Sequence, residues 1–335
     1  MIIGLSYDLK DSIPPEQDYT EDALEEYDSP ETINAIAAAI ETRGHTTVKL
    51  GGGMEFLTNI VSRKVDLVFN IAEGLGTYRS REAQVPSILE MLDIPYSGSD
   101  PQCLAISLDK PLAKKILKAS GVTTPQWHFI RSSDQLREID WKQFPLPAFI
   151  KPAYEGSSKG ISSGSVASSI EEITNAVSKM MDLYRQPVLV EQFISGDEVT
   201  VGITGNSPAK VVGIMHILPK KKTDKFIYCL EVKRDWVNLV EYECPAKLDQ
   251  KTLVKIEEAS LKIYKELGCR DFSRIDFKVS AGGEPYFLEI NPLAGLNPKS
   301  GDLPIMAGKM GLSYNNLILA IFDAAVERYP QCRKK

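Results

Sequence analysis

The sequence predicts an α/β chain that opens with a parallel β-sheet and continues into an α+β part rich in strands. The first hundred residues alternate short apolar segments with amphipathic ones, an order typical of parallel strands joined by crossover helices. After residue 100, apolar strand-like segments follow one another more closely, and a few long amphipathic helices separate them. A chain of 335 residues is long enough for two or three domains with a sizeable core.

Composition places the chain among folded globular proteins and narrows its partners. Apolar residues make up 43% and charged residues 25%, both close to the globular average. The 39 Lys and Arg against 45 Asp and Glu give a net charge of −6. We expect no nucleic-acid partner, because sequence-independent binding needs a dense cationic face. No apolar run approaches 18 residues, so we expect no membrane segment.

The cysteines and the N-terminus both indicate a cytoplasmic protein. Five Cys are widely spaced and include no C-x-x-C pair, which argues for reduced thiols and against a disulfide framework or a zinc site. The first residues lack a basic segment and reach Asp8 and Asp11 too soon for a signal peptide. The sequence leaves a homodimer open.

The N-terminal part begins with a predicted strand at residues 1–6. Residues 16–27 (EQDYTEDALEEY) are strongly acidic, and such runs usually form a solvated loop or a short surface helix. A helix then begins at Pro30 with Ser29 as its N-cap, since a hydroxyl followed by proline is a helix-start signal. Apolar residues recur on one face of this helix at positions 33, 36, 37 and 40.

The other predicted elements follow from apolar runs and their period. In the N-terminal part they are strands at 46–50, 66–70 and 94–96 and a helix at 81–92. Beyond residue 100 they are helices at 109–120, 170–184, 250–267 and 313–327, and strands at 127–130, 147–152, 187–193, 273–280 and 284–291. We divide these elements into three units, residues 1–98, 99–186 and 187–335.

A loop of small residues follows the predicted strand that ends near Lys151. A cation at a strand end, beside such a loop, is a natural phosphate contact. Residues 155–158 read E-G-S-S, and glycine lets backbone N–H groups approach phosphate oxygens closely. The loop does not match the G-x-x-x-x-G-K-[ST] pattern, and a plain flexible turn is the alternative.

The strand at 187–193 runs into an exposed hinge. Its backbone N–H and C=O groups can pair with an adenine edge, and Glu198 can accept hydrogen bonds from ribose hydroxyls. An ordinary buried strand followed by an acidic turn explains these residues equally well.

Two strands near the C-terminus carry oxygen-rich side chains on one face. Glu289 and Asn291 are two residues apart, so they point to the same side of their strand. Asp276, on the preceding strand, is expected to meet them across a strand pair. Two carboxylates and an amide oxygen suit Mg²⁺ bound to nucleotide phosphates, and they are costly if buried without a partner. Arg274 shares the face and can stabilise a transferred phosphoryl group.

Read in order, these segments resemble the D-alanine–D-alanine ligase branch of the ATP-grasp superfamily. The matching pieces lie between about residues 108 and 320 and read LDKPLAKKILKASGVTTP, FIKPAYEGSSKGI, VLVEQFISGDEVTV, SRIDFKV, YFLEINPLAGLNPKSGDLP and GLSYNNLI. Each piece is weak alone, but together, in this order and spacing, they are specific. The resemblance implies an ATP-grasp fold preceded by a Rossmann-like parallel-sheet domain.

The resemblance also implies which residues bind ATP. The expected contacts are Lys110, Lys151, Glu155, Gly156, Ser157, Ser158, Glu191, Phe193, Ile194, Glu198 and Lys233. Within this set, the two lysines 110 and 151 contact the phosphates, and the loop at 155–158 closes over them. Residues 191, 193 and 194 take the adenine, and residue 198 takes the ribose.

Further roles implied by the resemblance concern the metal and the reacting groups. The expected ligands of one or two Mg²⁺ ions, with Mn²⁺ as the alternative cation, are Asp276, Glu289 and Asn291. Arg274 acts on the phosphoryl group, and Ser157 lies near the substrate as well as the phosphates. The Gly295 backbone amide helps to hold the tetrahedral intermediate. Ser300 binds the carboxylate of the second substrate.

The segments expected to read the first substrate depart from the family. Its His-Gly-x-x-Gly-Glu-Asp-Gly run is missing, and the chain reads Ile-Ala-Glu73-Gly after the third strand. We still expect the first substrate here, because ligands bind beyond the carboxyl ends of parallel strands. Asp8 or Glu73 suits an ammonium group. Arg79 or Arg81 suits an anionic group, with a solvated helix start as the alternative for both arginines. The acidic residues 16–27 form either a lid or a solvated loop.

The function expected from this resemblance is ATP-dependent carboxylate–amine ligation. ATP would phosphorylate the carboxylate of one amino acid, and the amine of a second amino acid or small peptide would attack the resulting acylphosphate. Two alternatives stay open: a small-molecule kinase on the same fold, and a nucleotide-binding regulator without turnover. The presence of Arg274 with all three metal ligands favours an enzyme.

Overall fold

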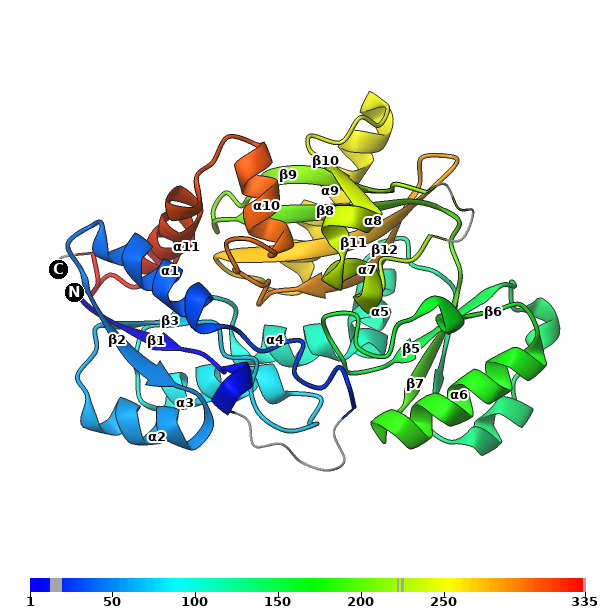
Figure 1. The fold of residues 1–335 in the computed structure, drawn as a ribbon, viewed down its shortest axis with the longest axis horizontal. Helices are drawn as coiled ribbons and strands as arrows, with labels where there is room; N and C mark the ends of the chain where they lie inside the picture. Colours follow the sequence, from blue (N-terminus) through cyan, green and yellow to red (C-terminus); the bar gives the residue numbers. More distant parts are fainter. Residues whose placement is uncertain (13–19, 222, 224–225, 334–335) are drawn as a thin grey trace.

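The computed structural model describes residues 1–12, 20–221, 223 and 226–333. It arranges them as three lobes (Figure 1): a parallel sheet with its helices, a small antiparallel sheet backed by one long helix, and a larger antiparallel sheet. In the described part of the chain, no helix combines the length and the apolar character needed to span a bilayer.

The N-terminal lobe contains a three-stranded parallel sheet in the order β2-β1-β3. Its strands are β1 (Ile2–Ser6), β2 (Thr46–Gly51) and β3 (Leu67–Asn70), and its helices are α1 (Pro30–Glu41), α2 (Gly53–Ser62) and α3 (Gln84–Met91), the last preceded by the 3₁₀ turn η2 (Arg81–Ala83). The Ser29 hydroxyl accepts a hydrogen bond from the Thr32 N–H, which confirms the predicted cap and start of α1.

Two features of this lobe differ from the prediction. Residues 94–96 do not form a fourth strand, because only Tyr96 pairs, in a single bridge to Val68. The helix α2 was not predicted. It begins directly after a glycine-rich strand end, and Gly53 takes a positive φ of 50° there. Its apolar residues Phe56 and Ile60 pack beneath the sheet.

The second lobe is a four-stranded antiparallel sheet, ordered β4-β7-β5-β6, with α6 packed against it. Its elements are β4 (Trp127–Ile130), β5 (Ala148–Pro152), β6 (Val166–Ala167), α6 (Ile170–Tyr184) and β7 (Val188–Gln192). The helices α4 (Pro101–Leu108) and α5 (Lys110–Ala119) lead into it from the N-terminal lobe. α4 was not predicted. The strand β7 pairs with β4 and β5, so this sheet extends beyond the predicted boundary at residue 186.

The third lobe is a five-stranded antiparallel sheet ordered β10-β9-β8-β11-β12. Its strands are β8 (Gly196–Thr204), β9 (Lys210–Pro219), β10 (Val240–Glu243), β11 (Phe272–Ser280) and β12 (Pro285–Asn291), and its helices are α7 (Leu230–Arg234), α8 (Trp236–Leu239), α9 (Gln250–Glu266), α10 (Asp302–Lys309) and α11 (Tyr314–Arg328). α9 covers one face, whereas α11 returns to pack on α1 in a shared core. The two ends of the chain are therefore tied together.

Candidate functional site

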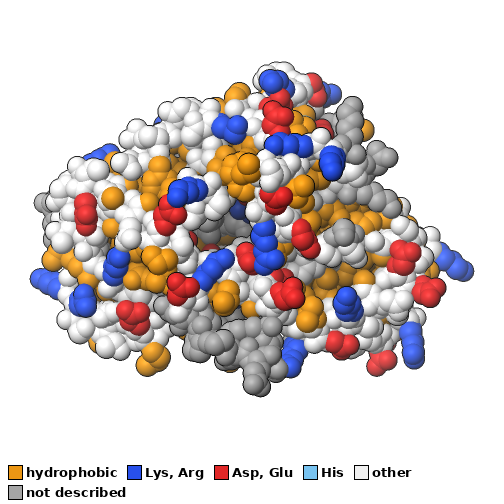
Figure 2. Space-filling view, in the orientation of Figure 1, with side chains coloured by type: hydrophobic (Ala, Val, Ile, Leu, Met, Phe, Trp, Pro, Cys, Tyr) orange, Lys and Arg blue, Asp and Glu red, His pale blue; other side chains and the backbone are white. Residues whose placement is uncertain are grey.

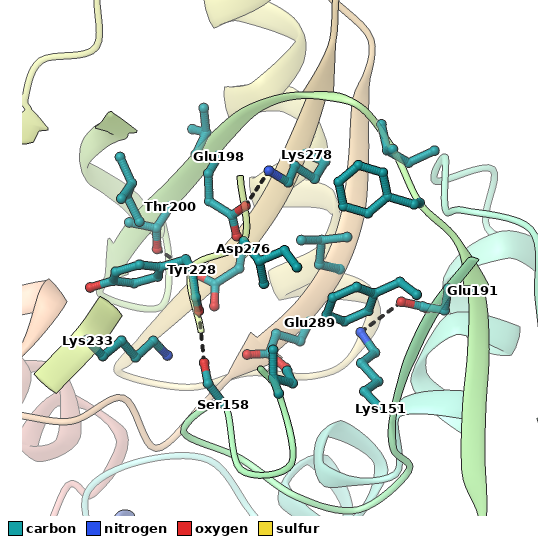
Figure 3. Close-up of a pocket in the computed structure, with 18 of the residues that line it drawn as sticks. Lys151, Ser158, Glu191, Glu198, Thr200, Tyr228, Lys233, Asp276, Lys278 and Glu289 are labelled. Carbon is teal, nitrogen blue, oxygen red and sulfur yellow. Dashed lines mark hydrogen bonds and ion pairs between the residues drawn. The ribbon is translucent and has the colours of Figure 1, made fainter. Parts of the chain in front are cut away.

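A cavity lies between the two antiparallel sheets, and we call it the inter-sheet cavity. Figure 3 shows side chains converging on it from β7, β8, β11 and β12. Its described lining residues are Phe149, Lys151, Ser158, Ile161, Glu191–Ile194, Glu198–Thr200, Ile217, Ile227, Tyr228, Lys233, Asp276, Lys278, Leu288 and Glu289. Apolar side chains line one part of the cavity, and charged groups line another, as a site for a base and its phosphates requires.

Glu198 and Lys278 lie on neighbouring strands that line this cavity. The Lys278 Nζ lies 2.6 Å from a Glu198 carboxylate oxygen, and both side chains are largely buried. The predicted hinge residues Phe193 and Ile194 line the same cavity. The structure therefore brings the four residues predicted for adenine and ribose, Glu191 included, into one space.

A buried ion-pair triad stands at the cavity wall. The Glu191 carboxylate lies 2.7 Å from the Lys114 Nζ and 2.8 Å from the Lys151 Nζ. Burial alone would raise the pKa of Glu191, but the two lysines hold it below its ordinary value. Burial lowers the pKa of Lys114 to about 8. Lys114 was not predicted as a site residue, although it lies one helical turn after Lys110 on the same face of α5.

The predicted metal set assembles on β11 and β12. Asp276 pairs directly with Glu289, and Arg274 pairs with Asn291. The Arg274 guanidinium donates to both Asp276 carboxylate oxygens at 3.0 and 2.9 Å, and the Asn291 amide lies 3.4 Å from one of them. The predicted strand pairing, which places all four side chains on one face, is confirmed.

Cations surround Glu289. The Lys110 Nζ lies 3.4 Å from a Glu289 carboxylate oxygen. Burial opposes ionisation of this carboxyl, but Lys110, Lys151 and Lys233 lower its pKa to about 2. Glu289 is therefore a carboxylate at any physiological pH, as a metal ligand must be.

The loop at 155–158 lies where this cavity meets a second one. Ser157 and Ser158 both have a left-handed backbone, with φ of 49° and 61°, which is uncommon outside glycine. Ser158 lines the inter-sheet cavity and donates to the Tyr228 carbonyl at 3.1 Å, whereas Ser157 lines the second cavity. The loop can therefore contact ligands in both spaces.

The second cavity lies where the three lobes meet, and we call it the junction cavity. Figure 2 shows charged side chains of both signs around a hollow at the middle of the molecule. The described residues that line it are Lys10, Glu25–Ser29, Glu73, Glu82, Ser107, Leu108, Lys110, Gly156, Ser157, Leu230, Lys233, Arg234, Trp236, Arg274, Ile290, Asn291, Leu293, Gly295, Asn297 and Ser300–Asp302. Lys233 lines both cavities. The predicted substrate residues Gly295 and Ser300 are brought here.

The acidic segment is not a solvated loop in its described part. Residues 16–19 lie outside the described residues, but the Glu26 side chain is only 4% exposed. It accepts a hydrogen bond from the Gly156 N–H at 2.7 Å and lies 3.0 Å from the Lys159 Nζ. The Asp22 carboxylate accepts from the Gly160 N–H at 2.8 Å. Burial of these carboxylates is tolerated because residues 156–160 supply a lysine and backbone N–H donors.

Arg81 completes this contact. Its guanidinium lies 2.8 and 2.7 Å from the two Glu26 carboxylate oxygens, and its side chain is 2% exposed. The solvated helix start is therefore wrong for Arg81. Against the cost of burial, Arg81 and Lys159 lower the pKa of Glu26 to about 2.

The structure does not bring Asp8 and Arg79 into either cavity. Asp8 is buried and accepts a hydrogen bond from the Gly74 N–H at 2.9 Å, and burial raises its pKa. The Arg79 side chain is 66% exposed and lies 3.4 Å from Asp109. Neither residue is among the described side chains that line the two cavities.

Three junction-cavity carboxylates were missed or placed differently by sequence reasoning. Glu25 and Asp28 belong to the acidic segment or follow it, and Glu82 lies in η2. Their positions in the sequence could have indicated a role in this site. The acidic segment follows the carboxyl end of β1 and η2 follows that of β3, and ligands of parallel sheets bind beyond such ends.

Comparison with known proteins agrees with this geometry. The family model described as the D-ala D-ala ligase C-terminus matches residues 116–323. A protein of Aquifex aeolicus named D-alanine–D-alanine ligase is 35% identical over 295 residues, which cover 88% of this chain and 94% of that protein.

Solved structures share the fold. The Bacillus anthracis D-alanine–D-alanine ligase complexed with ATP superposes with a TM-score of 0.73 at 22% identity, covering 100% of both chains. The VanG D-Ala:D-Ser ligase of Enterococcus faecalis has the same TM-score of 0.73 at 23% identity, covering 97% of this chain and 99% of that one. The predicted fold class is confirmed, and the chain belongs to the D-alanine–D-alanine ligase family of ATP-dependent ligases.

Proposed function

We propose that this ligase uses ATP and Mg²⁺ to activate the carboxylate of one amino acid and joins it to the amino group of a second amino acid or small peptide. One observation carries the proposal. The inter-sheet cavity, suited to a nucleotide, meets the junction cavity, suited to small polar molecules, at the phosphate loop and the Arg274–Asn291 side-chain set. A phosphoryl group could pass between the two cavities without leaving the protein.

ATP would lie with its base among the apolar residues of the inter-sheet cavity. Glu191, Phe193 and Ile194 would surround the adenine, and Glu198 would accept from the ribose. The triphosphate would extend toward Lys110, Lys151 and Lys233, while the backbone at 155–158 closes over it. These are the groups that a highly charged ligand needs when it leaves water.

The metal would be held by Asp276, Glu289 and Asn291. Among the described residues, no three Asp, Glu, His or Cys side chains form a metal cluster. A set of two carboxylates and an amide therefore fits a cation that takes its other ligands from phosphate and water. When bound, Mg²⁺ neutralises phosphate charge and orients the triphosphate.

The first chemical step is attack of a substrate carboxylate oxygen on the γ-phosphorus. The bond between that phosphorus and the bridging oxygen breaks, ADP leaves, and an acylphosphate forms. Arg274 would stabilise the charge on the transferred group. Its guanidinium is held in place by Asp276 at 2.9 Å and Asp302 at 3.4 Å.

The second step joins the two substrates. The unprotonated amine attacks the acylphosphate carbonyl, a tetrahedral oxyanion forms, and inorganic phosphate leaves as the amide is made. The Gly295 N–H would donate to that oxyanion. Ser300 would hold the carboxylate of the incoming amino acid, and Ser157 would contact the reacting groups from the loop. The protein contributes mainly position and charge neutralisation.

A panel assay identifies the substrates. The protein is incubated with ATP, Mg²⁺ and pairs of L- and D-amino acids, including D-alanine and D-serine, and phosphate release and ligated product are both measured. Ligation predicts one phosphate and one ADP for each amide formed. ADP with a phosphorylated amino acid and no amide would instead support a kinase, and nucleotide binding without ADP would support a regulator. We place the reaction in the cytoplasm, where ATP is available.

A further inference from the structure

We propose that the first substrate of this ligase carries a second cationic group, so that it is an amino acid with an ammonium or guanidinium side chain. This inference rests on the proposed function. It concerns the wall of the junction cavity that is built by the N-terminal lobe, which we call the acidic wall. Its residues are Asp28, Glu73 and Glu82.

The three carboxylates of the acidic wall come from separate segments. Asp28 lies just before α1, Glu73 follows β3, and Glu82 lies in η2. Glu82 is only 9% exposed, and its carboxylate forms no hydrogen bond or ion pair with the residues that the structure describes, although Arg81, Lys110 and Lys159 attract it from farther away. A buried carboxylate without a partner is costly unless a ligand supplies the opposite charge.

Most cations that line the same cavity already have acidic partners elsewhere. Lys10 and Arg234 pair with Glu25 at 3.8 and 2.7 Å. Lys110 pairs with Glu289 at 3.4 Å. Arg274 pairs with Asp276 and Asp302. Lys233 lines both cavities and lies among the groups proposed for the phosphates. Arg81, Lys110 and Lys159 also attract carboxylates of the acidic wall, but each of them already pairs with Glu26 or Glu289.

The protonation behaviour of the wall agrees with this pairing. Burial raises the pKa of Asp28 and of Glu82 to about 7, and burial together with repulsion from Glu82 raises that of Glu73 well above its ordinary value. A cationic ligand would reverse these shifts, because it stabilises the ionised carboxylates.

The arrangement fits an organic cation better than a metal ion. No three acidic, His or Cys side chains of the described residues lie close enough together to share a metal. An α-amino acid bound with its carboxylate toward Arg274 needs one acidic partner for its α-ammonium, and the acidic wall offers more than one.

The test compares cationic amino acids with neutral amino acids of the same shape. Lysine with norleucine, ornithine with norvaline, and arginine with citrulline are titrated, as L and D forms, into the full chain loaded with Mg²⁺ and a non-hydrolysable ATP analogue. We expect the preferred cationic member to bind about 10- to 100-fold more tightly than its neutral partner, the usual effect of a charge-assisted contact. The same pairs are compared as first substrates in the ligation assay.

Substitutions in the acidic wall test which carboxylates produce the preference for the cationic amino acid. Glu82→Gln should reduce the preference for the cationic member about tenfold or more and leave the affinity for the neutral member within about threefold. Glu73→Gln, at a less buried position, gives a second measurement that does not depend on the folding of the first variant. Glu258→Gln, on the exposed face of α9, is the matched control and should keep the full preference.

The outcomes separate this inference from the function on which it rests. Ligation of neutral amino acids with no preference for the cationic member of any pair would overturn the inference and leave the ligase function intact. A preference that persists in both Glu82→Gln and Glu73→Gln would also overturn it. Absence of amide product with every pair, alanine included, would contradict the proposed function itself.

Discussion

The two cavities of this ligase differ in how their buried carboxylates are paired. In the inter-sheet cavity, Glu191 is neutralised by two lysines and Glu289 lies among three. In the junction cavity, Asp28, Glu73 and Glu82 form no ion pair in the described structure, and the cations that attract them are already paired with other carboxylates. The first arrangement is built for a fixed polyanion, which every ATP-dependent ligase of this family must bind. The second leaves part of its charge to be completed by the substrate.

This difference follows the sequence. The segments around the inter-sheet cavity contain the motifs that resemble the family, whereas the N-terminal segments around the acidic wall depart from them. Under the proposed function, one part of the chain carries phosphoryl transfer and another chooses the substrate. Five variants test this division, from the largest expected effect to the smallest.

Glu289→Gln should have the largest effect on turnover. It replaces a charged metal ligand with a neutral one, and we expect kcat to fall by roughly 10²- to 10³-fold while the fold is kept. Steady-state ADP release at saturating Mg²⁺ measures this. Glu284→Gln, at the exposed start of the same strand region, is the control. A near-normal kcat for Glu289→Gln would remove Glu289 from the metal site.

Glu26→Gln should weaken the contact between the acidic segment and the phosphate loop. Breaking a buried ion pair leaves Arg81 and Lys159 less well compensated, at a cost of about 3 kcal/mol in the free energy of unfolding at pH 7. The low pKa of Glu26, about 2, means that its contribution is present above pH 4.5 and is lost as the pH falls toward 2. Urea unfolding of both proteins at pH 7 and at pH 3 measures the difference, which should shrink at the lower pH. An equal difference at both values would mean that ionised Glu26 is not the cause.

Lys151→Met should lower nucleotide affinity about 10- to 100-fold, because it removes a charge-assisted phosphate contact. It also leaves Glu191 with Lys114 as its remaining ion-pair partner in the described structure. Lys110→Met is expected to behave similarly. Titration with ATP measures the effect, and Lys115→Met, exposed on α5, is the control. Unchanged affinity in Lys151→Met would contradict its placement at the phosphates.

Glu82→Gln should change stability in the opposite direction from Glu26→Gln. A pKa raised to about 7 means that ionisation of Glu82 reduces stability as the pH rises from about 4.5 to 7. The amide removes this penalty, so without substrate the variant should be more stable at pH 8 by roughly 2 kcal/mol and unchanged near pH 4. Thermal unfolding across this range measures it. Lower stability at pH 8 would show that Glu82 has a partner that holds it ionised.

Arg79→Ala should have the smallest effect. The assignment of Arg79 to the first substrate stays a prediction, and its exposed side chain beside Asp109 makes a change in KM of less than about threefold the expected result. Kinetics with each accepted first substrate measures this. A tenfold rise in KM would support a role for Arg79 in binding the first substrate. Asp8→Ala is the informative companion, because Asp8 supports the backbone at Gly74 from a buried position.

Much of the catalytic part could be predicted from local patterns. The strand period of two places Glu289 and Asn291 on one face, and the cap at Ser29 with Pro30 begins α1 where expected. The long helices were also placed closely, and α6 occupies the predicted residues 170–184. α4 was missed because it is short and its apolar residues show little helical period, and α2 was missed because it begins directly in a run of glycines.

The sequence by itself determined the shared face of Glu289 and Asn291 and the alternation of elements that forms the N-terminal sheet, because these depend on neighbours a few residues apart. Tertiary structure alone decided the rest. Glu26 reaches the Gly156 N–H across 130 residues, and Lys114 reaches Glu191 from another element. A charged residue can be solvated, paired with another side chain, or free to bind a substrate. Which of these holds depends on the side chains that distant segments place beside it, since those partners set the cost of burying its charge.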